Sequence, residues 1–245
     1  MAAIEVSNSV PRHVQAANFI REKIYNHEWQ ADEQIPTEHE LADMLGMSRG
    51  TIRRAINTLV EEGLLVQMRG KGTFVTNSTI SHPTGNCLIS FAESLQSQGI
   101  DFTTRVVRQD VVKADDFISS KLYVPAGSPV LMLDRVRYVD DEPILYFESV
   151  ENLTALPGLE EFDFNENNLF ATIESNYNKR IGYSNAQYAA RVAGEKRGEM
   201  LGVSPESPVL HLRQQVFLTD NTPIEWSNVW LKANRYIVNT VLQRV

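Results

Sequence analysis

The stretch IPTEHELADMLGMSRGTIRRAINTLVEEGLLVQMRGKGTFV, residues 35–75, decides the fold of the first part of the chain. Thr37 followed three residues later by Glu40 is the pattern of a capping box, and Gly46 marks the end of the short helix that begins there. Ser48 is suited to cap a second helix, along which apolar residues recur at helical spacing. Two short apolar runs then flank the sequence RGKG. The pattern predicts a helix, a tight turn, a second helix and a two-stranded hairpin with a basic tip.

The second of these helices carries polar side chains on the face away from its apolar stripe. They cluster at its N-terminal end: Arg49, Thr51, Arg53 and Arg54. A DNA-recognition helix needs this layout, because its first turns enter the major groove. The alternative is a solvated basic helix face beside an ordinary hairpin. The combination of two capped helices, a short turn and a basic hairpin tip favours DNA binding.

Composition narrows the class of protein. The chain has 245 residues, enough for two domains, and a net charge of −8. Residues 48–76 nevertheless contain five basic residues against two acidic ones, so a small basic face lies on an acidic body. The single cysteine, Cys87, excludes an internal disulfide and fits a reducing cytoplasm. No signal peptide and no apolar run long enough to span a bilayer is visible, so we expect a cytoplasmic protein without a membrane partner.

The chain changes character after the hairpin. We expect a DNA-binding domain at 1–76, a small and polar linker at 77–87, and a second domain at 88–245. The second domain alternates helix-like and strand-like runs with hairpins, an α+β pattern rather than a βαβ repeat. Residues 127–133, GSPVLML, resemble residues 206–212, ESPVLHL. The repeat predicts a duplicated antiparallel sheet with pseudo-twofold symmetry and a pocket between its halves.

The order of these pieces resembles the GntR family of transcription regulators, in its HutC-like branch. The first domain is similar to that family's winged helix through 35–38 (IPTE), 47–53 (MSRGTIR) and 69–75 (RGKGTFV). The second domain resembles the UTRA effector-binding domain, which has the chorismate lyase-like fold. This likeness rests on SFAE at 90–93, LDRVR at 133–137, and Glu225 followed by Arg235 and Tyr236.

The resemblance implies that double-stranded operator DNA is the partner of the first domain. The residues expected to contact it are His39, Ser48, Arg49, Thr51, Arg53, Arg69, Gly70 and Lys71. Arg49 and Arg53 would contact bases or phosphates, and Gly70 would enter the minor groove. The family often has arginine where His39 stands. One recognition helix reads only a short half-site, so we expect a homodimer on a palindromic operator.

The resemblance also implies a small anionic effector, a phosphorylated sugar or amino sugar. The residues expected to bind it are Ser90, Phe91, Arg135, Arg137, Glu148, Asn168 and Glu225. Arg135 and Arg137 would share one strand face, as an anion clamp requires. Ser90 and Phe91 would offer backbone N–H groups at the start of a helix.

Two features of this expected site leave alternatives open. The two arginines could instead form a surface ladder with Asp134, Asp140 or Glu148. Glu148 lies five residues after Pro143, where relatives usually place a glutamate four residues after the proline. A bulge or a different pocket edge is therefore expected there.

The competing class is an enzyme, a lyase-like protein for small acids fused to a DNA-binding domain, because the second fold is shared with a lyase. The five histidines are scattered and form no metal-binding pattern, and no GxSxG or Walker-type loop is present. We therefore expect no catalytic residues, no metal and no cofactor. A purely architectural DNA-binding dimer would not need the arginine pair. The favoured function is a ligand-responsive regulator, a repressor released by its effector.

Overall fold

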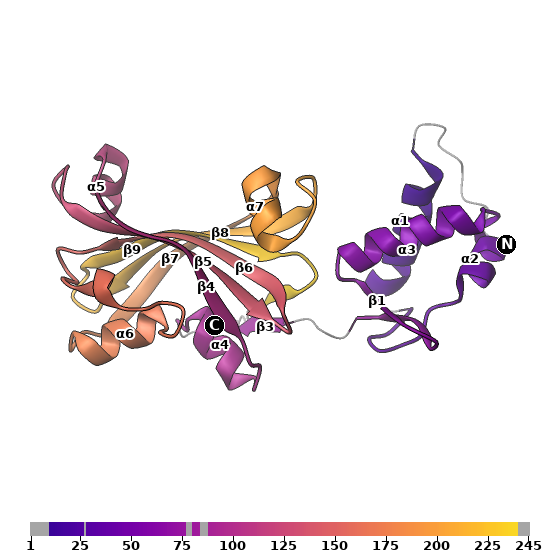
Figure 1. The fold of residues 1–245 in the computed structure, drawn as a ribbon, viewed down its shortest axis with the longest axis horizontal. Coiled ribbons are helices and arrows are strands. Elements are labelled where there is room, and N and C mark those ends of the chain that lie inside the picture. Colours follow the sequence, from indigo (N-terminus) through magenta and orange to yellow (C-terminus); the bar gives the residue numbers. More distant parts are fainter. Residues whose placement is uncertain (1–9, 27, 77–79, 84–87, 240–245) are drawn as a thin grey trace, which may run out of the picture. The chain divides into compact units, whose positions relative to one another are not determined.

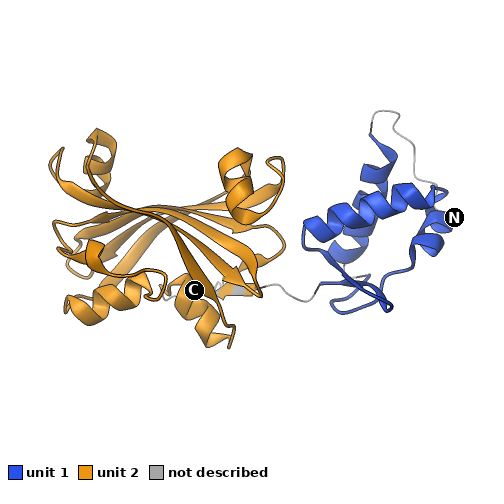
Figure 2. Ribbon diagram, in the orientation of Figure 1, with its two compact units in different colours: residues 1–79 blue, residues 80–245 orange. Residues whose placement is uncertain are grey.

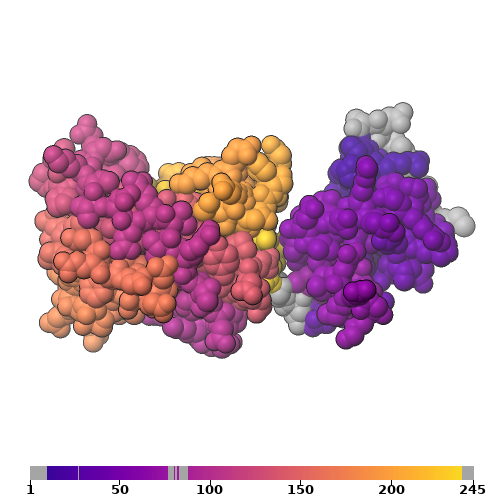
Figure 3. Space-filling view, in the orientation of Figure 1, coloured from indigo at the N-terminus to yellow at the C-terminus, as the bar shows by residue number. Residues whose placement is uncertain are grey.

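The computed structural model describes residues 10–26, 28–76, 80–83 and 88–239. It divides the chain into two compact units, residues 1–79 and 80–245 (Figure 2). In the space-filling view, coloured by residue number, each unit consists of one continuous range of the sequence (Figure 3). None of the helices in the described ranges is both long enough and apolar enough to cross a membrane.

The first unit has the expected winged helix. Its elements are α1 (Arg12–Tyr25), α2 (Glu38–Leu45), α3 (Arg49–Glu61), β1 (Leu65–Met68) and β2 (Gly72–Val75). Thr37 and Glu40 form the capping box of α2, and Ser48 caps α3. Gly46, between these helices, has φ 61°, a left-handed conformation that glycine adopts without strain. The apolar sides of the three helices meet the base of the hairpin in one core, which includes Ile20, Leu41, Ile52, Leu59 and Val75.

The second unit is built on a six-stranded antiparallel sheet with strand order β4-β5-β6-β9-β8-β7. The strands are β4 (Thr103–Lys113), β5 (Pro129–Val139), β6 (Glu142–Asn152), β7 (Ile181–Val192), β8 (Pro208–Leu218) and β9 (Pro223–Lys232). The helices are α4 (Phe91–Ser97), α5 (Asp116–Leu122), η1 (Leu159–Glu161), α6 (Leu169–Asn176) and α7 (Gly194–Leu201). The expected α+β class is confirmed.

The chain passes twice through the same sequence of elements. The first half runs α4-β4-α5-β5-β6 and the second runs α6-β7-α7-β8-β9, and the two halves meet where β6 pairs with β9. Helices α5 and α7 cover one face of the sheet, and α4 and α6 cover the other (Figure 1). We call the α4/α6 side the cavity face and the α5/α7 side the opposite face. Because strand side chains alternate, neighbouring residues of each strand serve different faces.

One part of the expected linker is a strand. Residues 80–83 form β3 (Ile80–Pro83), which pairs in parallel with β10 (Tyr236–Asn239). Ile80 and Tyr236 are each only 4% exposed and pack in the core beneath α4. The stretch is short, and its pairing partner lies more than 150 residues away, so local composition could not reveal it. The rest of the expected linker, including Cys87, lies outside the described residues.

Candidate functional site

Several of the residues expected to contact DNA lie at the start of α3. The Ser48 hydroxyl accepts a hydrogen bond from the Thr51 backbone N–H at 3.2 Å and lies 2.8 Å from the Thr51 hydroxyl. Arg49 and Arg54 are exposed on the same turns. The cap thus fixes the first turn of the helix, from which the basic side chains project.

Arg53 is held by an acidic residue on the neighbouring helix. Its Nε and one terminal nitrogen donate to the Glu38 carboxylate at 3.0 and 2.7 Å. These hydrogen bonds and the arginine charge hold the pKa of Glu38 below its usual value. The Arg53 side chain is still 63% exposed, so it can meet DNA while paired. His39, also exposed, has its Nδ1 3.2 Å from the Asp43 carboxylate.

The basic tip of the hairpin joins β1 to β2. Arg69, Gly70 and Lys71 are all exposed, and Gly70 has φ 77°. Gln34 donates from its side chain to the Lys71 carbonyl at 3.1 Å and braces the tip from the side. Gly72 has φ 128°, and a Cβ there would collide with Gln34. The glycines are therefore what allow this tight, narrow turn.

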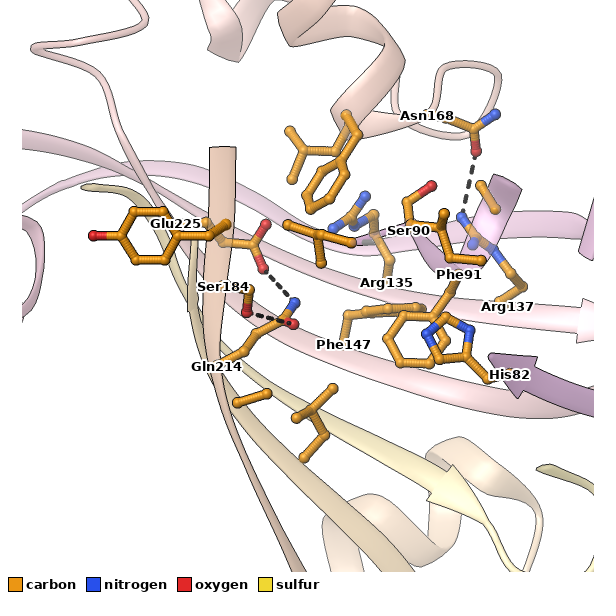
Figure 4. Close-up of a pocket in the computed structure, with 18 of the residues that line it drawn as sticks. His82, Ser90, Phe91, Arg135, Arg137, Phe147, Asn168, Ser184, Gln214 and Glu225 are labelled. Atoms are coloured by element: carbon orange, nitrogen blue, oxygen red, sulfur yellow. Dashed lines mark hydrogen bonds between the residues drawn. The ribbon is translucent and has the colours of Figure 1, made fainter. Parts of the chain in front are cut away.

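The second unit contains a cavity of about 400 Å³ between the N-terminal ends of α4 and α6, on the cavity face of the sheet. It brings together six of the seven residues expected to bind the effector: Ser90, Phe91, Arg135, Arg137, Asn168 and Glu225. Figure 4 shows both arginines, Asn168 and Glu225 around it. These side chains come from both halves of the duplicated fold, as the internal repeat predicts.

The two arginines are buried on the cavity face, and neither forms an ion pair with a carboxylate among the described residues. Arg135 is 6% exposed and Arg137 is 4% exposed. Within the described residues Arg135 has no hydrogen-bond or ion-pair partner, and its guanidinium lies over the rings of Phe147 and Phe164. The alternative of a surface ladder is therefore wrong, because its geometry needs exposed arginines.

Arg137 also lacks an ion-pair partner among the described residues. Its guanidinium stacks over Phe102. Among the described residues it makes only long hydrogen bonds, to the Asn168 side-chain oxygen at 3.4 Å (Figure 4) and to the Thr104 hydroxyl at 3.4 and 3.5 Å. Burial, together with the positive charge of Arg135, lowers the pKa of Arg137 to about 9. Two buried guanidinium groups that repel one another are stabilised by a bound anion.

The other end of the cavity carries acceptors. Glu225 is 4% exposed and stands opposite Glu151, which is fully buried, in the β6–β9 pair. Burial and the Glu225 charge raise the pKa of Glu151 well above its usual value. The Ser149 hydroxyl donates toward a Glu151 carboxyl oxygen at 2.6 Å and toward the Leu133 carbonyl at 2.9 Å. The raised pKa of Glu151 reduces the negative charge that the Glu151–Glu225 pair offers to Arg135.

Polar neighbours orient Glu225. Gln214 donates to its carboxylate at 3.3 Å, and the Ser184 hydroxyl donates to the Gln214 side-chain oxygen at 3.5 Å (Figure 4). These bonds are long and leave acceptor capacity on Glu225 toward the cavity. The arrangement suits hydroxyl groups at this end and an anion at the arginine end.

The role expected of the Ser90 backbone is wrong in one respect. Its N–H already donates to the Glu93 carboxylate at 2.6 Å, and its hydroxyl accepts from the Glu93 N–H at 3.1 Å. This is a closed capping box, so the Ser90 N–H is not available to a ligand. The next two N–H groups, of Phe91 and Ala92, have no acceptor among the described residues. The sequence SFAE at 90–93 fits either a ligand-binding helix start or a capping box. The sequence analysis predicted the first and missed the capping box.

Glu148 does not line the cavity, and its expected role in the effector site is corrected. It projects from the opposite face, where it accepts hydrogen bonds from Trp230, Lys196 and Arg197 at 2.7, 2.9 and 3.0 Å. A bulge between β5 and β6 shifts the register beside Arg137, next to the turn. The residue four positions after Pro143 is Phe147, and Phe147 faces the cavity.

Several lining residues were not anticipated from the sequence. They are His82, Phe147, Ser184, Tyr188 and Gln214 among others. His82, from β3, stacks on Phe91 at 4.5 Å, and burial lowers its pKa to about 4. Ser184, Tyr188 and Gln214 follow the period-two alternation of their strands. Strand alternation could have predicted this, because Leu212 and Gln214 share a face in any strand covering 208–218.

Comparisons with known proteins match both units. The family model for bacterial regulatory proteins of the gntR family matches residues 13–75, and the UTRA domain model matches residues 97–237. The chain is 29% identical over 234 residues to the mannosyl-D-glycerate transport/metabolism system repressor MngR of Escherichia coli (strain K12), across 96% of this chain and 97% of that repressor.

Two further likenesses cover most of the chain. A Shigella flexneri protein named as a probable fructoselysine utilization operon transcriptional repressor is 30% identical over 210 residues, 84% of each chain. The crystal structure of PhnF from Mycobacterium smegmatis superposes with a TM-score of 0.66 at 23% identity, across 93% of this chain and 98% of PhnF. This last likeness concerns the fold alone.

Proposed function

The chain belongs to the GntR family of bacterial regulatory proteins and carries a UTRA domain, and from this premise we propose that it is an operator-binding repressor released by a small sugar-derived anion. The winged helix binds DNA as part of a homodimer. The cavity of the second unit binds the effector. The single observation that carries the effector assignment is the pair of buried arginines without carboxylate partners.

The chemistry of the cavity supports an anion joined to a polyhydroxylated body. Arg135 and Arg137 supply charge-assisted donors at one end, which are roughly twice as strong as neutral ones. Glu225, Gln214 and Ser184 supply a hydrogen-bonding rim at the other end. A phosphorylated sugar or amino sugar combines both features. The names of two relatives, which mention mannosyl-D-glycerate and fructoselysine, agree with sugar-derived compounds.

The expected roles of the DNA-facing residues separate base contacts from phosphate contacts. Arg49→Ala should weaken binding to the operator by about 1–3 kcal/mol if Arg49 makes a bidentate base contact. Lys71→Ala should weaken binding to every sequence and reduce the slope of log affinity against log salt by about one unit. Fluorescence anisotropy on operator and random DNA over a salt series measures both.

The matched control is the substitution of an arginine in the second unit. Arg108, exposed on β4 and paired with Asp110 at 2.8 Å, has no part in the winged helix. Arg108→Ala should leave operator affinity unchanged. Equal losses on operator and random DNA for Arg49→Ala would show that Arg49 touches only phosphate.

The effector is sought by thermal-shift screening of phosphorylated sugars, amino sugars and organic acids on the full-length chain. A true effector should raise stability by mass action, by about 2.7 kcal/mol at a hundredfold excess over its dissociation constant. Each compound that stabilises the protein is then incubated with it and assayed for chemical change. Stabilisation without turnover supports the regulator, and turnover of the compound supports the lyase-like enzyme instead.

A further inference from the structure

A fully buried carboxyl group lies next to a residue of the effector cavity. Glu151, on β6, is 0% exposed, and Glu225, which lines the cavity, stands directly opposite it on β9. Directly opposed residues of neighbouring strands have Cβ atoms about 5 Å apart, and like charges in such positions destabilise a sheet. The charge on one of these carboxyl groups therefore opposes the ionisation of the other.

Few polar groups near Glu151 can stabilise its ionised form. The Ser149 hydroxyl lies 2.6 Å from one of its carboxyl oxygens. The other carboxyl oxygen is buried without a hydrogen-bond partner among the described residues, and so is the hydroxyl of Ser227, which stands opposite Ser149. A buried carboxylate needs several hydrogen bonds to replace the water that it has lost. The surroundings of Glu151 therefore favour a protonated acid.

Two charges act on Glu151 from the neighbouring strands. Burial and the charge of Glu225, on β9, raise its pKa, and the charge of Arg135, on β5, acts in the opposite direction. The residues that β8 places nearest to Glu225, Gln214 and Val216, are neutral. The buried side chains that η1 and α6 place over this part of the core are not titratable: Leu159, Leu169, Thr172 and Ile173. The ionised form of Glu151 thus depends on Arg135.

An anion in the cavity would withdraw that support. Arg135 lines the cavity together with Arg137, so a bound anion pairs with the same guanidinium group that acts on Glu151. Once the anion offsets the charge of Arg135 and brings further negative charge close by, the ionised form of Glu151 becomes less favourable. The affinity of Glu151 for a proton must therefore rise when the anion binds.

We propose that Glu151 takes up a proton when an anion binds at Arg135 and Arg137, so that effector binding and protonation of Glu151 stabilise each other. The proposal rests on the anion-binding cavity proposed above and concerns how that cavity responds to pH. Glu151 acts through its neighbours and does not touch the ligand, so it is a positioning residue. With its proton in place, the negative charge of the pair lies on Glu225, whose free acceptor capacity faces the cavity.

The coupling fixes the sign of the pH dependence of anion affinity. At a pH low enough for Glu151 to be protonated in the free protein, the anion binds without proton uptake and its affinity is highest. As the pH rises through the pKa of Glu151 in the free protein, binding requires a proton from solvent and affinity falls. Above the pKa of Glu151 in the complex, affinity is again independent of pH. Each unit by which the anion raises this pKa lowers the affinity about tenfold across the window.

Inorganic sulfate is the probe, because it keeps both charges throughout the range, whereas a phosphate monoester titrates near pH 6. Sulfate replaces chloride at equal ionic strength, thermal unfolding reports its affinity, and the acid needed to hold the pH reports proton uptake. The wild type should take up a fraction of one proton per chain, and its sulfate affinity should fall about tenfold between about pH 5.5 and about pH 7.5. This range avoids the pKa of His82, about 4, and that of Arg137, about 9.

Glu151→Gln tests the residue itself, because glutamine keeps the shape of the protonated acid and does not titrate. The variant should bind sulfate with the same affinity across the range and take up no proton. A purely structural role for Glu151 would change the unfolding temperature but leave the pH profile of sulfate affinity as in the wild type. Glu148→Gln, the same change on the opposite face of the same strand, is the matched control and should keep the wild-type uptake and profile.

The outcomes separate this proposal from the effector site itself. If sulfate stabilises the wild type but not Arg135→Met, the arginine pair binds anions; proton uptake that is then absent, or equal in the wild type and Glu151→Gln, overturns the coupling alone. If sulfate stabilises the wild type and Arg135→Met equally, or stabilises neither, the arginine pair does not bind it, and the proposed effector site fails together with the coupling.

Discussion

The two faces of the sheet carry polar clusters on adjacent residues of the same strands, and the clusters differ in how far they are satisfied. On the opposite face, Asp134 accepts from the Tyr146 hydroxyl at 3.1 Å and from Lys196 at 3.4 Å. Glu148, beside it, accepts from Trp230, Lys196 and Arg197. Every member of this cluster has a partner, and the cluster ties α7 to the sheet.

On the cavity face the buried groups are left open. The Nε of Arg135, one oxygen of Glu151 and the hydroxyl of Ser227 are buried without a hydrogen-bond partner among the described residues. Buried polar groups in folded proteins are nearly always paired, so each such atom marks a place where a partner is missing. The comparison shows that a cluster whose members are all paired holds the fold together, whereas an incompletely paired cluster keeps hydrogen-bonding capacity that a ligand can use.

The largest effect we expect is on effector affinity. Arg135→Met and Arg137→Met should each weaken effector binding by about 1.5–3 kcal/mol, roughly 10- to 150-fold, because each removes a charge-assisted hydrogen bond. Neither should lower the unfolding temperature of the free protein, because the lost cation is buried and poorly compensated. Titration calorimetry and thermal unfolding measure the two quantities. A variant that loses stability but keeps effector affinity would make these arginines part of the scaffold.

On the opposite face we expect a smaller effect, on the stability of the fold and not on effector affinity. Glu148→Gln should destabilise the fold by about 1–3 kcal/mol, because it weakens the bonds from Lys196, Arg197 and Trp230. The lower end is favoured, since Lys196 and Arg197 are partly exposed, 53% and 36%, and solvent screens them. Effector affinity should not change. Urea denaturation beside calorimetry provides the measurement, and loss of affinity at full stability would return Glu148 to the effector site.

The two faces should also respond to pH in opposite directions. Burial alone would raise the pKa of Glu148, but its hydrogen bonds from Lys196, Trp230 and Arg197 outweigh burial and lower it. Glu148 therefore stabilises the fold above the unfolded pKa, and this contribution is lost as the pH falls through its folded value. Glu151, whose pKa is raised, stabilises the fold most below the unfolded pKa, and this contribution is lost as the pH rises.

The smallest effect we expect follows from the raised pKa of Glu151. Glu151→Gln replaces a protonated acid by a neutral isostere, so near pH 4 it should change the unfolding free energy by less than about 1 kcal/mol. At pH 8 the variant should be more stable than the wild type, since it no longer holds an acid protonated against its solution preference. Urea denaturation across this range decides the matter, and a variant that is less stable at pH 8 would show that Glu151 is ionised in the fold.

The winged helix could be predicted almost completely from sequence, because its signals are local. The capping pairs Thr37–Glu40 and Ser48–Thr51 and the glycines of the turns lie within a few residues of the contacts they make. The sheet was also predictable, because its strands alternate and its halves repeat. The cavity residues Arg135, Arg137 and Glu225 followed from the family resemblance together with strand alternation.

What the sequence could not reveal depends on distant pairing or on a single-residue shift. β3 finds its partner β10 at the far end of the chain, so Ile80 looked like part of a linker. Glu148 was assigned to the wrong face because a bulge near Arg137 decides which residue of β6 points inward. The N–H of Ser90 was assigned to a ligand although Glu93, three residues on, occupies it.

The most direct test of the account is the release of operator DNA by the effector in the wild type and in Arg135→Met. Labelled operator is bound to each protein at the same saturation, and the effector found by screening is titrated while anisotropy is followed. The account predicts equal operator affinity for both proteins, release from the wild type as the effector saturates, and no release from the variant over the same range. Equal release from both would contradict it, because the cavity would then not be where the protein senses its ligand.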